Sequence, residues 1–217
     1  MILSIDTTSE FGSIALTDGG RTVEEIPLHS PDGFGHILFQ RIERLLARHK
    51  VDVNQMDCFA AASGPGSFTG VRVGLTAVKG LAEATGKRVV AVSNLRALAF
   101  FGTAPLRATV LDARRGEVYG AVYNDRLEIV SAEVVMKFPA WLEALPKNGF
   151  EFLAVDFAPF RGSVDPNIPV ITAPRSLAAA IGQIAFTEHK QGRASGPAEI
   201  AANYVRRSDA ELFWTER

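Results

Sequence analysis

The sequence has one cysteine, almost no net charge and no long apolar run. Because Cys58 is alone, no disulfide can form within the chain, and its place in an apolar stretch favours a small buried residue over a nucleophile or ligand. The formal net charge of -1 excludes a broad electrostatic attraction to nucleic acid, so any RNA contact would be local or made by a partner.

Signals for membranes and secretion are also missing. No apolar run reaches the length of about 20 residues that crosses a bilayer, and Met1–Asp6 lacks the basic segment and cleavage site of a signal peptide. The 217 residues, 47% of them hydrophobic, suffice for one large domain or two small ones with genuine cores. We therefore expect a compact, soluble, cytoplasmic protein with no membrane contact.

The first third of the chain predicts three strands followed by a helix. Ile2–Ile5 forms a short apolar strand that ends at Asp6. Residues 12–17 alternate and then break at Asp18-Gly19-Gly20, which is a strong signal for a hairpin into a third strand. Apolar residues recur at helical spacing over residues 36–48, opposite a charged face, so an amphipathic helix follows the strands.

Ser63–Gly74 is typical of a strand end, a tight turn and a helix start. A strand is predicted at 58–63 and a helix at 70–85, with Gly86 as its stop and Ser67 or Thr69 as its cap. Amides at such a turn can seat a phosphate or carboxylate, or the turn can be purely structural. The spacing is not that of a P-loop, because Val and Arg follow the last glycine where Lys and Ser or Thr are needed; a dinucleotide fingerprint would also come earlier.

The helix predicted at 70–85 is apolar or small nearly all round. Its valines and leucines cannot lie on one narrow stripe, and glycines and alanines fill much of the remainder. Such a helix is either sunk inside a domain or packs a second face against a partner, and the sequence leaves both alternatives open.

The second half of the chain repeats the order of the first. After a strand at 88–92 and a helix at 94–101 capped by Ser93, Gly102–Pro105 marks a boundary. Further strands are predicted at 107–111, 117–123, 127–135, 150–155 and 170–172, with helices at 140–145 and 177–189. We expect an α/β protein of two lobes, 1–104 and 105–217, with a C-terminal tail that could pack back on the first lobe.

Two polar stretches carry candidate chemistry. Asp6 and the hydroxyls after it could hold a metal-bound nucleotide, or Asp6 could cap the hairpin turn; ATPases of the actin and sugar-kinase type generally have a glycine next, where Thr7 would crowd a phosphate. Between two predicted strands, Arg114 and Arg115 could clamp an anion, or they could be loop cations paired with Asp112 and Glu117.

Metal and hydrolytic sites are weakly supported. His29 and His36 are seven residues apart with no further ligands nearby, so we expect no metal site, and His36 fits a polar residue near a helix start. The serines and threonines of the 63–74 stretch have no evident His and Asp partners, which argues against nucleophilic hydrolysis.

Four motifs together resemble the bacterial TsaB (YeaZ) family, from the first strand to near the chain's end. They are Ile2-Leu3-Ser4-Ile5-Asp6-Thr7-Thr8, Gly64-Pro65-Gly66-Ser67-Phe68-Thr69-Gly70-Val71-Arg72-Val73-Gly74, Asp112-Ala113-Arg114-Arg115-Gly116-Glu117-Val118-Tyr119 and Tyr204-Val205-Arg206-Arg207. The resemblance implies an actin-like ATPase (RNase H-like) fold of two similar lobes, each a mixed sheet flanked by helices. It also implies a role in the threonylcarbamoyl modification of the tRNA adenosine next to the anticodon.

In that system a TsaD subunit carries the metal, the nucleotide and the transfer chemistry, and a TsaE subunit hydrolyses ATP. The resemblance therefore implies a non-catalytic partner that is not itself an enzyme, has no intrinsic cofactor and meets tRNA only through the complex. A nucleotide could lie at the interface with the TsaD-like partner, with Asp6, Thr7 and Arg114 as candidate contacts.

Family members pair through helices of the N-terminal lobe, with TsaD or as homodimers. This favours a partner-facing surface on the helices at 36–48 and 70–85. The interface candidates are His36, Phe39, Thr69, Arg72, Val73, Thr76, Ala77 and Gly80. The segment Ser30–Gly35 departs from the family, which more often has polar residues there, and this leaves the approach to the first helix open.

Two other functions are weighed against this one. An autonomous ATP-dependent phosphotransferase of the same fold is suggested by Asp6 and the glycine-rich turn. Peptidase activity has been attached to the wider superfamily, but no triad or metal motif in the sequence supports it.

Overall fold

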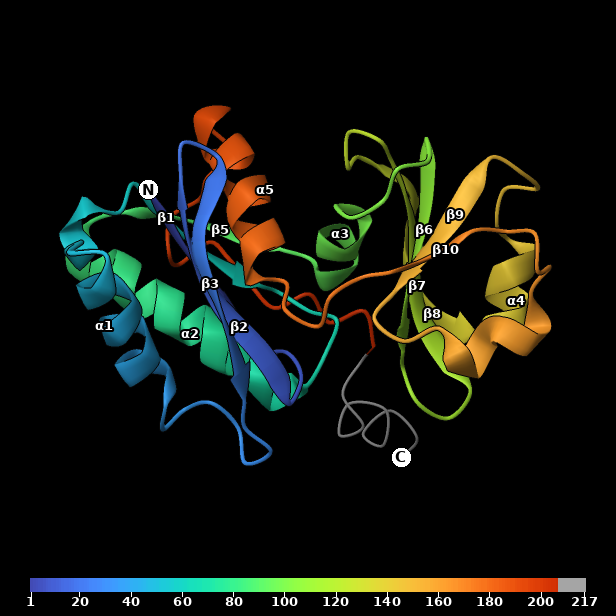
Figure 1. The fold of residues 1–217 in the computed structure, drawn as a ribbon, viewed down its shortest axis with the longest axis horizontal. Coiled ribbons are helices and arrows are strands. Elements are labelled where there is room, and N and C mark those ends of the chain that lie inside the picture. The colour runs from blue at the N-terminus through green and yellow to red at the C-terminus, as the bar shows by residue number, and fades with distance from the viewer. Residues whose placement is uncertain (207–217) are drawn as a thin grey trace, which may run out of the picture. The chain divides into compact units, whose positions relative to one another are not determined.

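The computed structural model describes residues 1–206, which fold into two compact units (Figure 1). Unit 1 consists of Met1–Ala97 and Arg175–Ala202, and unit 2 of Leu98–Pro174 together with the described residues 203–206. Of the Tyr204–Arg207 motif, Arg207 lies outside the described residues. The expected division at residue 104 differs from these units mainly in residues 175–202, which belong to unit 1 because a late helix packs on its sheet.

Unit 1 is built on a five-stranded mixed sheet in the order β3-β2-β1-β4-β5. The first two strand pairs are antiparallel and the other two are parallel. The strands are β1 (Ile2–Asp6), β2 (Phe11–Asp18), β3 (Arg21–His29), β4 (Cys58–Ala62) and β5 (Arg88–Val92). The predicted hairpin is confirmed, because β2 and β3 pair and Gly19 and Gly20 between them have positive φ angles.

Helices cover both faces of this sheet (Figure 1). Leu3 and Ile5 of β1 join one apolar cluster with residues of α1 (Leu38–Arg48) and α2 (Phe68–Thr85). On the alternate positions, Ser4 Oγ donates to the backbone oxygen of Ala178 at 2.7 Å, at the start of α5 (Ala178–Lys190). The small Gly182 lets α5 approach closely, since a Cβ there would lie 2.4 Å from Thr17 Oγ1. The opposite faces of β1 thus hold different helices.

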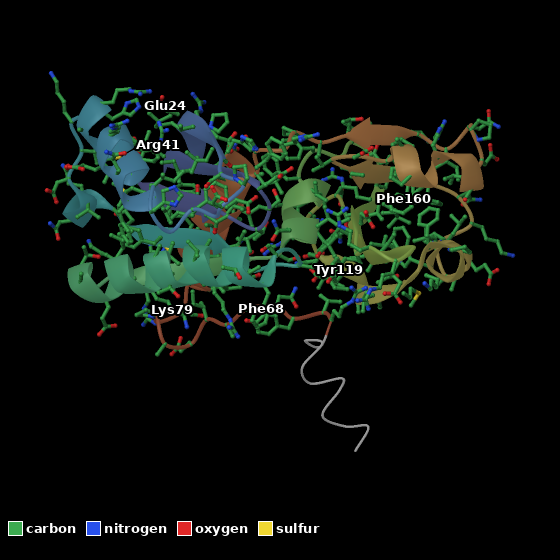
Figure 2. The ribbon with its side chains drawn as sticks, turned by 90° about the horizontal axis from the view of Figure 1, so that it is seen from below. Glu24, Arg41, Phe68, Lys79, Tyr119 and Phe160 are labelled. Atoms are coloured by element: carbon green, nitrogen blue, oxygen red, sulfur yellow. The ribbon has the colours of Figure 1, made fainter. Side chains whose placement is uncertain are left out.

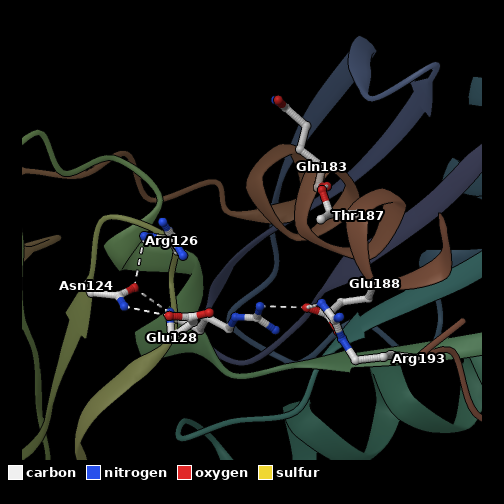
Figure 3. Close-up of polar contacts among 8 residues, drawn as sticks. Asn124, Arg126, Glu128, Gln183, Thr187, Glu188 and Arg193 are labelled. Atoms are coloured by element: carbon white, nitrogen blue, oxygen red, sulfur yellow. Dashed lines mark hydrogen bonds and ion pairs between the residues drawn. The ribbon is translucent and has the colours of Figure 1, made fainter. Parts of the chain in front are cut away.

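An ion network around the buried Glu188 ties α5 to the rest of unit 1 (Figure 3). Glu188 accepts hydrogen bonds from Arg96 of α3 (Asn94–Ala99) at 2.6 Å and from Arg193 Nε at 2.5 Å. These interactions hold the pKa of Glu188 below its ordinary value, with the hydrogen bond from Arg193 as the largest cause.

Helix α2 begins two residues earlier than the sequence predicted. Ser67 is its cap and accepts from the Gly70 amide at 3.3 Å, so Phe68 and Thr69 form the first turn. The predicted stop is confirmed, because Gly86 has a left-handed φ of 65°.

Unit 2 repeats the strand order with different coverage. Its sheet has the order β10-β9-β6-β7-β8, with the same alternation of antiparallel and parallel pairs. The strands are β6 (Leu106–Asp112), β7 (Glu117–Asn124), β8 (Ile129–Lys137), β9 (Phe150–Ala154) and β10 (Val170–Thr172). The core on one face is aromatic and includes Trp141 of α4 (Phe138–Glu143) and Phe160 of the 3-10 helix η2 (Ala158–Ser163). A second short 3-10 helix, η1 (Val53–Gln55), lies in unit 1.

Helix α4 starts at Phe138 rather than at the predicted residue 140, because Pro139 is accommodated in the first turn where no amide is needed. Across residues 1–206, none of the helices combines the length and the apolar character needed to cross a membrane.

Candidate functional site

The loop after β1 is braced by its own side chains. Asp6 is 2% exposed, and its Oδ1 accepts hydrogen bonds from the Thr8 amide at 2.9 Å and the Thr8 hydroxyl at 2.7 Å. Burial raises the pKa of Asp6, and the bonds from Thr8 oppose this rise without cancelling it. The arrangement is that of a carboxylate that caps a turn, which was one of the two alternatives for Asp6.

Asn94 joins this loop to the loop after β4. Its side-chain Nδ2 donates to Thr8 Oγ1 at 2.7 Å, and its Oδ1 accepts from the Gly64 amide at 3.0 Å. The backbone amide of Ser67 donates a further hydrogen bond to the backbone carbonyl of Thr8 at 2.7 Å. The sequence reasoning missed Asn94, although its position just after β5 is informative, because the carboxyl ends of parallel strands meet at one edge of a sheet.

Helix α2 rests directly on the loop after β1. Thr7 Oγ1 donates to the Gly70 oxygen at 2.7 Å, and an added Cβ at Gly70 would lie 2.0 Å from the Thr7 oxygen. Gly74, one turn further along α2, also lies close to the Thr7 hydroxyl, and Gly66, in the loop before the helix, lies close to Thr8. The three glycines therefore allow α2 and the loop before it to pack closely on the loop after β1, and no space for a phosphate is left between Thr7 and α2.

Helix α2 has one buried and one exposed side. The sequence left open whether the helix is sunk inside a domain or offers a face to a partner; one side fits the first alternative and the other side leaves room for the second. The buried residues are Val71, Gly74, Leu75, Ala77, Val78 and Ala82. Among the interface candidates, Thr69, Arg72, Thr76 and Gly80 are exposed and Val73 is half-buried. Ala77 is 4% exposed within the chain's own core, so it does not present its side chain to a partner. Figure 2 shows Phe68 and Lys79 on the outer side of this helix.

Helix α1 also leaves a polar outer side with one large apolar group. Phe39 is 56% exposed and His36, just before the helix, is exposed as well. Figure 2 shows Arg41 and Glu24 on this side of unit 1, where Glu24 pairs with His49 at 2.7 Å and with Arg48.

The approach to α1, which the sequence left open, is held by a buried aromatic ring. Phe34 is 2% exposed, and its backbone carbonyl accepts a hydrogen bond from the Leu38 amide at 2.9 Å. The turn before it is closed by Ser30, whose hydroxyl donates to the Gly33 oxygen. A single phenylalanine among glycines was the signal for this anchor.

The turn between β6 and β7 in unit 2 holds the two candidate arginines. Arg114, Arg115 and Gly116 have consecutive left-handed φ angles of 66°, 56° and 71°. The Arg114 amide donates to Asp112 Oδ1 at 2.7 Å, and its guanidinium, 87% exposed, lies 3.8 Å from Asp112 Oδ2. Glu117 pairs instead with Arg206, so of the two carboxylates in the ion-pair alternative only Asp112 lies beside a loop arginine.

The remaining candidates have structural surroundings. The ring of His29 stacks on Phe11 with centroids 4.7 Å apart, and His36 lies on the surface. Over residues 1–206, no three His, Cys, Asp or Glu side chains gather as metal ligands. Cys58 is fully buried, and desolvation raises the pKa of its thiol to about 12, which confirms the predicted role as a small buried residue.

Comparison with known proteins supplies the context for this geometry. A family model described as TsaD, tRNA N6-adenosine threonylcarbamoyltransferase, matches residues 27–191. The chain is 28% identical to the tRNA threonylcarbamoyladenosine biosynthesis protein TsaB of Haemophilus influenzae, over 98% of this chain and 95% of that protein. It is also 28% identical to the protein of the same name from Bacillus subtilis, over 99% and 98% of the two chains.

Solved structures confirm the fold class. YeaZ from Pseudomonas aeruginosa superposes with a TM-score of 0.76 and 26% identity over 94% of this chain and 98% of that one. Two mixed sheets of the same strand order, each flanked by helices, form the actin-like, RNase H-like fold that the motifs implied. The chain therefore belongs to the family that the TsaD model describes and, within it, to the TsaB (YeaZ) proteins.

Proposed function

We propose that this chain is a non-catalytic subunit of tRNA threonylcarbamoyladenosine biosynthesis that binds and activates a TsaD-like transferase. The observation that carries the proposal is the whole-length similarity to two proteins named for this biosynthesis. The closed loop at Thr7 supports the non-catalytic part, because the space that a phosphate would need beside α2 is taken up by helix packing.

The outer sides of α1 and α2 form the partner surface in this proposal. They carry the two largest exposed apolar side chains of these helices, Phe39 at 56% and Phe68 at 42%. The guanidinium carbon of Arg72 lies 3.7 Å from the centre of the Phe68 ring, so an aromatic and a charged group are presented together. Aromatic and arginine side chains are the groups that most often dominate binding energy at interfaces.

Other components follow from the same proposal. The chain needs no cofactor of its own, and a nucleotide would be held chiefly by the TsaD-like subunit. Of the three candidate contacts, the side chains of Asp6 and Thr7 are engaged inside unit 1, which leaves Arg114 as the exposed one. A TsaE-like ATPase would be the third component, tRNA would be met in the complex, and a homodimer would be the state of the chain without its partner.

The principal test is complex formation with the TsaD-like protein from the same cell. Phe39→Glu and Thr76→Glu should each weaken the complex at least about tenfold, because a buried unpaired charge is costly at an interface. Ile129→Glu is the matched control: Ile129 is 61% exposed but lies in unit 2. Failure of the unaltered chain to bind any TsaD-like protein would contradict the proposal.

The alternative of an autonomous phosphotransferase is less favoured. It would require ATP to bind to the isolated chain at the loop after β1, where Thr7 and Asp6 are buried. Isothermal titration calorimetry with ATP and magnesium should show no heat of binding. A micromolar dissociation constant that is lost on Asp6→Asn would instead support the alternative.

A further inference from the structure

The cationic groups at the β6–β7 turn of unit 2 have no role in the partner surface on α1 and α2. We call residues 112–117 the arginine loop. Lys137 Nζ donates to the Arg115 oxygen at 2.6 Å, and the Arg206 guanidinium donates to the Ala113 oxygen at 2.9 Å. Side chains from two other segments of unit 2, Lys137 and Arg206, thus add positive charge to the turn that holds Arg114 and Arg115.

The carboxylates of the loop do not balance this charge. The loop and the side chains that contact it include two carboxylates, Asp112 and Glu117, and four cations, Arg114, Arg115, Lys137 and Arg206, which is an excess of two positive charges in a chain of net charge -1. Glu117 is already paired with Arg206. The ion pair of Asp112 with Arg114 joins groups that are 43% and 87% exposed, and solvent screens such a pair strongly.

The loop also presents unused hydrogen-bond donors. Within the described part of the chain, the amides of Arg115 and Gly116 and the guanidinium of Arg115 meet no acceptor. Arg114 and Arg115 hold left-handed φ angles, each of which costs about 1–2 kcal/mol for a residue with a Cβ. The strained backbone at these two adjacent residues places both arginine side chains at the exposed tip of the turn.

The exposure of these donors decides which anion they suit. A free nucleotide normally binds in a concave site that buries most of its surface, whereas Arg114 is 87% exposed. A polyanion gains from several exposed contacts at once, because each neutralised phosphate releases counterions. Next to the loop, Arg206 lies 5.6 Å from the ring of Tyr119, which Figure 2 labels in unit 2, so an aromatic group adjoins the cations.

We propose that the arginine loop contacts the phosphodiester backbone of the tRNA that the complex binds, with Arg114 and Arg115 as the principal contacts. This inference rests on the proposed function, since it requires the complex to bring tRNA to the chain. The contact adds affinity without reading sequence, because phosphate contacts carry no base information.

The test uses the complex with the TsaD-like subunit and an unmodified tRNA transcript with adenosine next to the anticodon. The double variant Arg114→Glu/Arg115→Glu should raise the dissociation constant for tRNA at least about tenfold at low salt and should reduce the slope of log affinity against log salt by about two. Arg126→Glu/Lys147→Glu is the control, because it changes the charge of unit 2 equally at exposed positions outside the loop. Arg114→Lys/Arg115→Lys should retain most of the affinity.

Assembly without tRNA and thermal melting are measured for the same variants. The inference predicts both to be unchanged in the loop variant. An unchanged tRNA affinity and salt slope would overturn it, and so would a loss of assembly without tRNA, which would assign the loop to an acidic protein surface. Loss of ATP binding by the complex with tRNA affinity intact would assign the arginines to a nucleotide. If the unaltered chain forms no complex, the proposed function fails first and the inference fails with it.

Discussion

The same position in the two units is used in opposite ways. In each unit the first strand ends at an aspartate and a turn leads to an antiparallel second strand: Asp6 in unit 1 and Asp112 in unit 2. In unit 1 the turn is covered by α2, and Asp6 is 2% exposed. In unit 2 the short 3-10 helix η2 follows the fourth strand instead, and the turn presents Arg114 and Arg115 to solvent. One strand order thus supports a closed structural turn and an open charged one.

The hydrophobic cores of the two units also differ in composition. The main cluster of unit 1 consists mostly of aliphatic residues and alanines from the sheet and two long helices. The cluster of unit 2 gathers six aromatic rings from short elements: Phe138, Trp141, Phe150, Phe152, Phe157 and Phe160. Large rings compensate for short helices, since each aromatic side chain buries more area than an aliphatic one.

The largest effect is expected from breaking the aromatic core. Trp141 is 3% exposed and lies against Gly120, where a Cβ would come within 2.3 Å of the indole. Trp141→Ala should lower the free energy of unfolding by about 4 kcal/mol through the cavity it leaves. Hydrogen exchange should show faster opening at β7 and unchanged protection at β1. The matched change in unit 1, Leu45→Ala, should give the reverse pattern, and equal losses in both units would mean that they unfold together.

The next effect concerns the contact of α2 with the loop after β1. Gly70→Ala should cost about 3 kcal/mol, because the new methyl group meets backbone that cannot move aside. Gly80→Ala in the same helix is the control: Gly80 has nothing within 4 Å of an added Cβ, and alanine should stabilise the helix by up to about 1 kcal/mol. Urea unfolding of both variants measures the difference. A Gly70 variant as stable as the unaltered chain would show that α2 does not rest on the loop.

A smaller effect should follow from the ion network of α5. Glu188→Gln should cost about 2 kcal/mol at pH 7, since the three charged hydrogen bonds that Glu188 accepts from Arg96 and Arg193 are weakened. Because the pKa of Glu188 is lowered on folding, its contribution is present above the ordinary value of 4.5 and is lost as the pH falls through the folded pKa. The difference in the free energy of unfolding between the variant and the unaltered chain should therefore disappear in acid. The control Glu128→Gln, at an exposed position, should show no such difference at pH 7 or in acid.

The smallest effect distinguishes the two aspartates. Burial raises the pKa of Asp6, so its contribution to stability is present below 3.8 and is lost as the pH rises through the folded pKa. Asp6→Asn should thus be at least as stable as the unaltered chain at pH 7, by up to about 1 kcal/mol, with the gain gone in acid. Asp112→Asn at the half-exposed position should change the unfolding free energy by less than about 0.5 kcal/mol. Greater loss of stability at pH 7 from Asp6→Asn than from Asp112→Asn would contradict this comparison.

Local chemistry made most elements predictable from the sequence. Asp18-Gly19-Gly20 can hardly be anything but a hairpin turn, and Ser67 and Gly86 carry the side chain and the backbone freedom that a helix needs at its two ends. The family could also be recognised from the motifs, because the glycines that let α2 approach Thr7 have to lie at particular positions of the helix.

Long-range partners were not predictable in this way. Glu117 pairs with Arg206, 89 residues away, although Arg114 and Arg115 are far closer in sequence. Ala77 and Gly80 look alike as small residues of one helix, yet only the packed structure shows that the first is buried and the second exposed. The return of residues 175–202 to unit 1 depends on Ser4 and Thr17, whose small size on the sheet gave no sign of the helix that covers them.

The return of α5 to unit 1 also sets an order of events during synthesis. When β5 leaves the ribosome at Val92, one face of the first sheet still lacks the helix that begins at Ala178. At elongation rates of 5–20 residues per second, that face waits roughly 4 to 17 s while the strands of unit 2 emerge. The sheet of unit 1 therefore receives its last helix only after every strand of unit 2 has emerged, and a nascent chain paused before Ala178 carries an exposed sheet face as a substrate for chaperones.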